Sequence, residues 1–126
     1  MQFIIPLPPV TKKNSQQILR NSKTGKPFIV PSRQYRQYEA AASWYIKPGM
    51  EPISTPCNIK ALFYMPTKRR VDLVNLQEAL LDVLVHCGVL ADDNSAVVVS
   101  MDGSRVLYDK NNPRTELTIE SLGDNR

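Results

Sequence analysis

The chain has 126 residues, 42% of them hydrophobic and 22% charged, which is enough to fold as one domain around its own core. No apolar run approaches the roughly 20 residues of a membrane span, and the first residues lack the segments of a signal peptide, so we expect a cytoplasmic protein. The formal net charge of +4 fits a nucleic-acid partner, and it equally fits charge that only keeps the protein soluble.

The first part of the chain predicts a strand followed by a β-arm. Residues 2–7 read as a short apolar strand that is ended by prolines, and a basic loop with Lys12 and Lys13 follows. Two short segments, Gln17-Ile18-Leu19 and Phe28-Ile29-Val30, flank a polar turn that contains a glycine, which predicts a small exposed β-arm. An arm that grips DNA and an ordinary surface hairpin both fit this pattern.

A first helix is predicted over residues 33–47, with Ser32 as its N-cap and Pro48-Gly49 as its stop. Aromatic side chains recur along it, near two arginines, and they could stack on bases. Because an aromatic stripe on a helix is more often part of the core, we expect packing rather than base contact. The aromatic residues are Tyr35, Tyr38, Trp44 and Tyr45.

Residues 57–65 alternate in polarity, which predicts a strand that Pro66 ends. A basic triplet, Lys68-Arg69-Arg70, follows the carboxyl end of this strand. We expect these cations to contact DNA phosphates. Contacts of this kind position the protein on the backbone but do not read the base sequence. The alternative is a solvated strand end.

A second helix is predicted over residues 73–87, because its leucines and valines repeat at helical spacing and Gly88 follows its end. A polar stripe lies on another face of this helix. The stripe consists of Asp72, Asn75, Glu78, Asp82 and His86.

Three further strands complete the pattern, over residues 96–101, 105–108 and 114–120. The order of elements predicts an α+β fold, a single small domain over residues 1–126 with two main helices on one mixed β-sheet. Cys57 and Cys87 fall at apolar positions without metal-ligand spacing, so both are predicted to be buried free thiols.

Carboxylates flank the second helix, with Asp72 at its start and Asp92 and Asp93 after its end. Hydrolysis of a phosphodiester is well served by Mg²⁺ held by carboxylates, with cations nearby for the phosphates. The two ends of this helix lie about 20 Å apart at about 1.5 Å per residue, so these acids meet only if the chain returns along the helix. The alternative is structural: Asp72 caps the helix, and the later acids with Asn94 form a turn.

The stretch Asp72-Leu73-Val74-Asn75-Leu76-Gln77-Glu78, followed a helix later by Asp92-Asp93, resembles the RusA family of Holliday junction resolvases. That family's pattern is Asp-x-Asp-Asn-Leu-x-Lys, a helix and Asp-Asp. The likeness extends to the Pro-rich first strand, the strand before the basic triplet and the closing segment 113–119, so it covers most of the chain. It implies a RusA-like fold and a homodimer that nicks four-way DNA junctions symmetrically using Mg²⁺, for which Mn²⁺ can substitute. Such proteins are commonly encoded by phages or prophages, and we expect neither a membrane nor a nucleotide cofactor.

The resemblance assigns roles residue by residue. Asp72 and Asp93 match catalytic acids that bind the metal, Asp92 is a further candidate ligand, and Asn75 belongs to the helix-start signature. Two positions depart from the pattern, because Val74 replaces the second acid and Glu78 replaces a lysine.

Glu78 lies one helical turn beyond Val74, and a helical side chain leans back toward the helix start. We therefore hypothesise that Glu78 supplies the catalytic carboxylate that Val74 lacks, while the basic triplet covers for the missing lysine.

The sequence thus predicts a Mg²⁺-dependent endodeoxyribonuclease that resolves Holliday junctions by paired nicks during recombination, replication or repair. DNA binding is assigned to the basic loop and the basic triplet, which are Lys12, Lys13, Lys68, Arg69 and Arg70. Two alternatives stay open: a weakened or inactive nuclease that still binds junctions, and a structural or regulatory partner protein on the same scaffold that binds no DNA.

Overall fold

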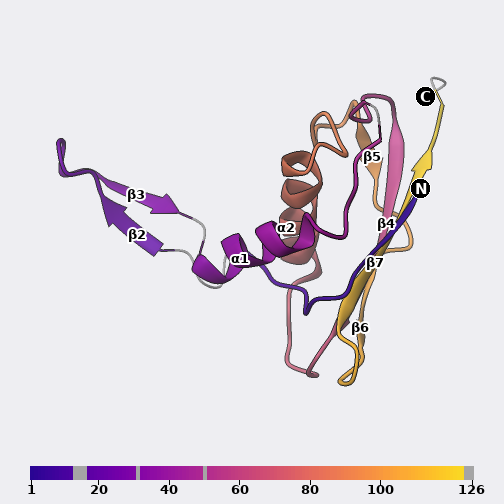
Figure 1. Ribbon diagram of the computed structural model, residues 1–126, viewed down its shortest axis with the longest axis horizontal. Helices are drawn as coiled ribbons and strands as arrows, with labels where there is room; N and C mark the ends of the chain where they lie inside the picture. Colours follow the sequence, from indigo (N-terminus) through magenta and orange to yellow (C-terminus); the bar gives the residue numbers. More distant parts are fainter. Residues whose placement is uncertain (13–16, 31, 50, 124–126) are drawn as a thin grey trace.

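The computed structural model describes residues 1–12, 17–30, 32–49 and 51–123. A five-stranded mixed sheet is built around β4 (Cys57–Met65). On one side β4 pairs antiparallel with β7 (Arg114–Ser121), which in turn pairs antiparallel with β1 (Gln2–Ile5). The α+β fold predicted from the order of elements is confirmed (Figure 1).

The other edge of β4 is shared by two short strands that lie one after the other. β5 (Val98–Ser100) pairs in parallel with the start of β4, and β6 (Arg105–Tyr108) pairs in parallel with its end. Parallel neighbours need a crossover connection, and α2 (Leu73–His86) provides it. This arrangement places the start of α2 just beyond the carboxyl end of β4.

The strands and helices form because their apolar side chains can share one core. In β4 the alternate residues Ile59, Ala61 and Phe63 are buried, as the period of two requires. Helices α1 (Arg33–Ala42) and α2 lie on the same side of the sheet (Figure 1). The buried stripe of α2 recurs at three- and four-residue steps and contains Leu76, Ala79, Leu80, Val83 and Leu84.

The first helix is shorter than its predicted span of residues 33–47. It ends at Ala42, and Ser43, Trp44 and Tyr45 continue in a turn whose amide groups donate to carbonyls three or four residues back. The turn delivers Ile46 into the core, where it is 1% exposed. Trp44 is consequently 80% exposed and Tyr45 46% exposed, so the expectation of a fully packed aromatic stripe is wrong for these two.

The other elements agree closely with the sequence. Tyr35 and Tyr38 are core residues, and Ser32 caps α1 by accepting a hydrogen bond from the Tyr35 amide at 3.0 Å. Both cysteines are free as predicted, but only Cys57 is buried; Cys87 is half-buried, so the predicted burial is wrong for that residue. Within the described part of the chain, no helix has the length and apolar character to cross a membrane.

A separate two-stranded sheet confirms the predicted arm. β2 (Gln17–Arg20) pairs antiparallel with β3 (Pro27–Val30), and the hairpin projects away from the rest of the molecule (Figure 1). Its turn is closed by Asn21, whose side-chain oxygen accepts from the amides of Lys23 and Thr24 at 2.8 and 3.1 Å. Gly25 takes a φ of +69° in this turn, which favours glycine.

Asn58 is a buried polar residue that fixes the connection between β5 and β6. It is 6% exposed, and its side-chain oxygen accepts from Ser100 Oγ at 2.6 Å and from the Asp102 amide at 2.7 Å. Its amide nitrogen donates to the Asp102 carbonyl at 3.2 Å. One side chain therefore ties the end of β5, and the turn that leads on to β6, to β4.

We predict that Asn58→Ala lowers the free energy of unfolding by about 1–3 kcal/mol, because buried partners lose their hydrogen bonds. Denaturant unfolding monitored by circular dichroism measures the change. Ser100→Ala removes only one of these bonds and should cost less. An Asn58→Ala protein no less stable than the Ser100→Ala protein would contradict the role assigned to Asn58.

Candidate active site

The loop between β4 and α2 ends at Asp72, which is the N-cap of α2. Its Oδ1 accepts a hydrogen bond from the Val74 amide at 3.0 Å, so the capping role predicted as a structural alternative is confirmed. Asp72 is nevertheless exposed, and a cap uses only part of the acceptor capacity of a carboxylate. A capping role and a metal-binding role are therefore compatible at this position.

The basic triplet lies in the same loop. Lys68, Arg69 and Arg70 are all exposed, within four residues of Asp72. The ammonium group of Lys68 sits 5.2 Å from the centre of the Tyr108 ring, which ties this end of the loop to β6. The triplet therefore places three positive charges beside a carboxylate at the end of β4.

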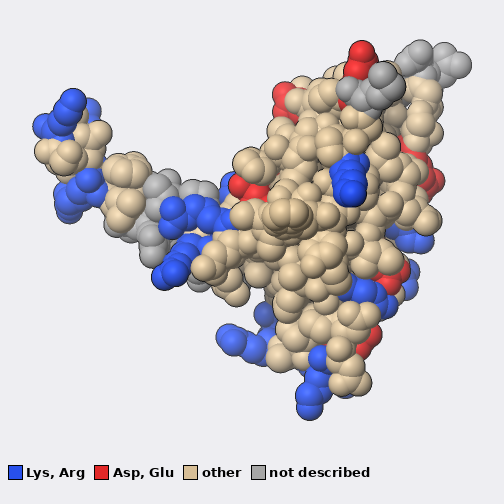
Figure 2. Space-filling view, viewed as in Figure 1, with Lys and Arg blue, Asp and Glu red and all other residues tan. Residues whose placement is uncertain are grey.

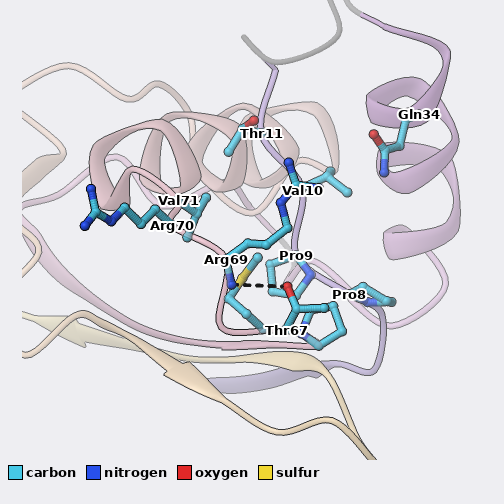
Figure 3. Close-up of a pocket in the computed structure, with 11 residues that line it drawn as sticks. Pro8, Pro9, Val10, Thr11, Gln34, Thr67, Arg69, Arg70 and Val71 are labelled. Atoms are coloured by element: carbon cyan, nitrogen blue, oxygen red, sulfur yellow. Dashed lines mark hydrogen bonds between the residues drawn. The ribbon is translucent and has the colours of Figure 1, made fainter.

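A cavity of about 510 Å³ opens next to this loop. Its walls come from the N-terminal segment after β1, from the loop after β4 and from α1 (Figure 3). In Figure 3 Gln34 lies across the cavity from the triplet loop, and the Arg70 side chain points away from Pro8 and Pro9. The loop is braced by the Arg69 amide, which donates to Thr67 Oγ1 at 3.4 Å. The cavity thus has prolines on one wall and two residues of the basic triplet, Arg69 and Arg70, on another.

The second acidic segment follows α2 and is a turn, as its composition predicted. Asp92 Oδ1 accepts from the Asp93 amide at 2.7 Å, and Asp92 Oδ2 accepts from Asn94 Nδ2 at 3.1 Å. Asn94 Oδ1 in turn accepts from the Ala96 amide at 2.9 Å. Both aspartates are exposed.

Two neighbouring acids act on the Asp93 carboxyl at this turn. Partial loss of water raises the pKa of the Asp93 carboxyl above its ordinary value, and the carboxylates of Asp92 and, more weakly, Asp82 raise that pKa further. Asp82, on α2, accepts a hydrogen bond from Lys12 Nζ at 2.5 Å. The sequence contained a signal for Asp82, because it belongs to the polar stripe of the second helix, but its position near Asp93 was not predicted.

Asp72 and the Asp92-Asp93 pair are not brought together within one chain. The chain after α2 stays at the helix's C-terminal half, where the Leu90 amide donates to the Leu84 carbonyl at 3.3 Å. Asp72 caps the opposite end, about 20 Å away along a helix of this length at about 1.5 Å per residue. Among the described residues, no three Asp, Glu, His or Cys side chains form a metal-binding group.

The two positions that depart from the family pattern lie on the outside of α2. Val74 is 56% exposed, and Glu78 is exposed one turn further along. Asn75 is half-buried between them. The helix therefore presents Val74 and Glu78 on an accessible surface near the end that Asp72 caps.

The predicted basic loop differs from the basic triplet, because its described lysine, Lys12, forms an ion pair with an acid. Lys12 is bound to Asp82 and lies 5.3 Å from the centre of the Tyr35 ring, so its charge is already paired with an acid of the same chain. Tyr35 itself donates to Glu39 Oε2 at 2.9 Å. Lys13, the other predicted DNA contact of this loop, lies outside the described residues.

Comparison with known proteins relates most of the chain to one family. The family model described as Endodeoxyribonuclease RusA matches residues 6–120. A crossover junction endodeoxyribonuclease RusA from Shigella sonnei is 31% identical over 125 residues, covering 95% of this chain and 93% of that protein. The protein of the same name from Escherichia coli K12 is 36% identical over 75 residues, covering 57% of this chain. The match spans 58% of the length of that Escherichia coli relative.

We predict that Asp93→Asn stabilises the protein at neutral pH. The folded-state pKa of Asp93 is raised above its ordinary value of 3.8, so the ionised carboxylate destabilises the folded state. The contribution of this group to the free energy of unfolding is therefore favourable below pH 3.8 and is lost as the pH rises through the folded-state pKa. Removing the charge should therefore raise the melting temperature at pH 7, with the difference vanishing near pH 3.

Thermal unfolding at both pH values measures this effect, and Asp102→Asn, in an exposed turn, is the matched control. A melting temperature at pH 7 that falls in Asp93→Asn, or rises equally in the control, would contradict the prediction.

Proposed function

The chain belongs to the RusA family of endodeoxyribonucleases, and on that premise we propose that it is a metal-dependent endonuclease that binds four-way DNA junctions and resolves them by paired nicks. The observation that carries the proposal is the arrangement at the end of β4. There, the basic triplet, a cavity of about 510 Å³ and the exposed Asp72 adjoin one another. Such a site can bind a phosphate backbone beside a carboxylate. A protein acting on DNA in this way would work in the cytoplasm.

Mg²⁺ is the proposed cofactor, and Mn²⁺ is expected to replace it. The candidate ligands, Asp72, Asp92 and Asp93, offer only oxygen donors, which Mg²⁺ prefers. Protein sites for Mg²⁺ often use one or two carboxylates and take further oxygens from substrate phosphates and water, so the exposed Asp92-Asp93 pair fits this ion. When bound, the metal supplies an activated water and stabilises charge on the reacting oxygens.

The residues of the chain bind the phosphate backbone and orient the candidate ligands. The basic triplet holds the phosphate backbone against the loop after β4, because its guanidinium and ammonium groups form charge-assisted hydrogen bonds to phosphate. Asp72 keeps a fixed direction, since its bond to the Val74 amide anchors it to the helix start. The Asp92 carboxylate orients the turn that presents Asp93.

A homodimer suits this substrate, because a four-way junction offers two strands for symmetric nicking. A second chain also brings a second set of acids. This matters because Asp72 and Asp93 lie at different ends of α2 within one chain.

A second candidate function is a junction-binding protein that cuts slowly or not at all. Val74 favours it, since valine cannot ligate a metal at the position of the family's second acid. Within the nuclease proposal, Glu78 compensates, because its carboxylate can lean back from the next turn toward Val74. The two candidates differ only in the response to metal.

For the wild-type protein we expect nicks in a labelled mobile four-way junction that appear only with Mg²⁺ or Mn²⁺. Matched linear duplex should stay intact, and Asp72→Asn should lose the nicks while retaining junction binding, because it removes a ligand and not a cation. Denaturing gels and band-shift assays in the same buffer provide the two measurements. Tight binding without any cut in either metal would reject the nuclease and favour the junction-binding protein.

Glu78→Gln should reduce cleavage at least about 100-fold, which exceeds the typical loss of a second-shell partner. Junction affinity should change little, since the substitution removes a negative charge. Adding Val74→Asp to this variant should restore metal-dependent cleavage, because it returns a carboxylate to the family's position. Single-turnover cleavage rates test both variants, and a wild-type rate in Glu78→Gln alone would rule out a catalytic role for Glu78.

A further inference from the structure

We propose that the β2–β3 arm is a second DNA-binding surface, a two-stranded ribbon that lies in the major groove of duplex DNA and contacts its phosphates. The inference rests on the proposed function only in taking DNA as the partner. It does not require that the protein cuts. The surface is distinct from the basic triplet and from the acids, because the arm projects from the body of the molecule (Figure 1).

Charge is divided very unevenly along the chain. Residues 1–38 contain seven Lys and Arg and no Asp or Glu, whereas residues 39–126 contain nine Lys and Arg and twelve Asp and Glu. The first segment therefore carries a formal charge of +7 and the rest −3, which together give the net +4. The basic character of this protein belongs to the segment that contains the arm.

The arm concentrates part of this charge where it can reach a partner. Residues 19–28 are exposed throughout, including Arg20, Lys23 and Lys26. On the face drawn in Figure 2, basic side chains cover the far end of the arm and no acidic side chain lies over it. The potential around the arm is consequently positive with no acidic residue of its own to neutralise it.

The turn keeps these cations available. It is built from backbone groups and from Asn21 and Thr24, which accept the amide protons of Lys23 and Lys26. The ammonium groups of the two lysines are not needed to hold the hairpin. Arg20 Nη1 donates to the Gly25 carbonyl at 3.2 Å and leaves the other donors of a five-donor guanidinium for a ligand.

The shape of the arm suits a groove of DNA. The major groove is about 12 Å wide and admits a two-stranded β-ribbon. Four paired residues in each strand give about 14 Å of ribbon at about 3.4 Å per residue, with the turn beyond it. The cations lie at and beside that turn, so they can reach phosphates on either side of the groove.

A second copy of the chain is the competing partner. Leu19 and Phe28 form a cross-strand pair on the arm, and they are 46% and 44% exposed. An apolar pair can stabilise a dimer, but a second arm would bring together two surfaces of the same positive sign, which is unfavourable. The charge distribution therefore favours a polyanion.

The test compares two triple variants with the same loss of charge. The arm variant carries Arg20→Gln, Lys23→Gln and Lys26→Gln. The control carries three matching changes on the body of the molecule, Lys47→Gln, Arg105→Gln and Lys110→Gln. Binding of both to fluorescent linear duplex is measured by anisotropy without divalent metal, between about 50 and 200 mM salt. Melting temperature and light-scattering mass are measured alongside.

In the arm variant, the slope of log affinity against log salt should become shallower by about 2 to 3, since three phosphate contacts contribute about 0.9 each. Affinity near 0.1 M salt should fall on the order of 100-fold, and the control should keep both values close to wild type. An unchanged slope in the arm variant, or an equal loss in both variants, would overturn the proposal. A drop from dimer to monomer mass with unchanged DNA affinity would also overturn it and assign the arm to a second copy.

Failure of this proposal and failure of the proposed function are separable in the same assays. Wild-type protein that binds duplex through the arm and never nicks a junction would support the arm and reject the nuclease. Metal-dependent nicking, with a DNA affinity that does not depend on the arm, would support the nuclease and reject the arm as a DNA-binding surface.

Discussion

The pairing of β4 with neighbours on both sides is the constraint on which the rest of the molecule depends. Eight residues of β4 are matched to β7, and the opposite edge is held by β5 and β6. Because β4 is fixed along its whole length, the loop at its carboxyl end has a defined origin. That loop carries the basic triplet and delivers Asp72 to the start of α2. The helix can then only return across the sheet, which sets where the second acidic turn lies.

Electrostatics separates two tasks in this small protein. Asp72, Asp92 and Asp93 are exposed on the body of the molecule, and residues 39–126 carry a formal charge of −3. The arm holds uncompensated positive charge at a distance. In the proposed complex with DNA, the positive arm would offset the repulsion between the phosphate backbone and residues 39–126.

The sequence predicted those features that depend on local pattern. The bounds of the β4 strand were predicted to the residue, because Asn58 and Lys60 alternate with apolar residues in its first half and Pro66 follows Met65. The second helix was predicted within one residue, since Asp72 and Gly88 mark its ends. The end of α1 was missed because its last turn changes geometry to bury Ile46, which is a tertiary requirement. The relation of Asp72 to Asp93 depends on how the chain packs after α2, and that packing has no signature in the spacing of residues.

The position of β7 has a consequence for how the chain acquires its structure as it is made. β7 follows the other described strands in the chain, yet it lies inside the sheet, between β1 and β4. Until β7 leaves the ribosome, β1 has no partner and one whole edge of β4 exposes unpaired backbone groups, which are a template for association with other chains. The described sheet can therefore be completed only after β7 has been synthesised, rather than progressively from the N-terminus, and pairings this distant in sequence form slowly.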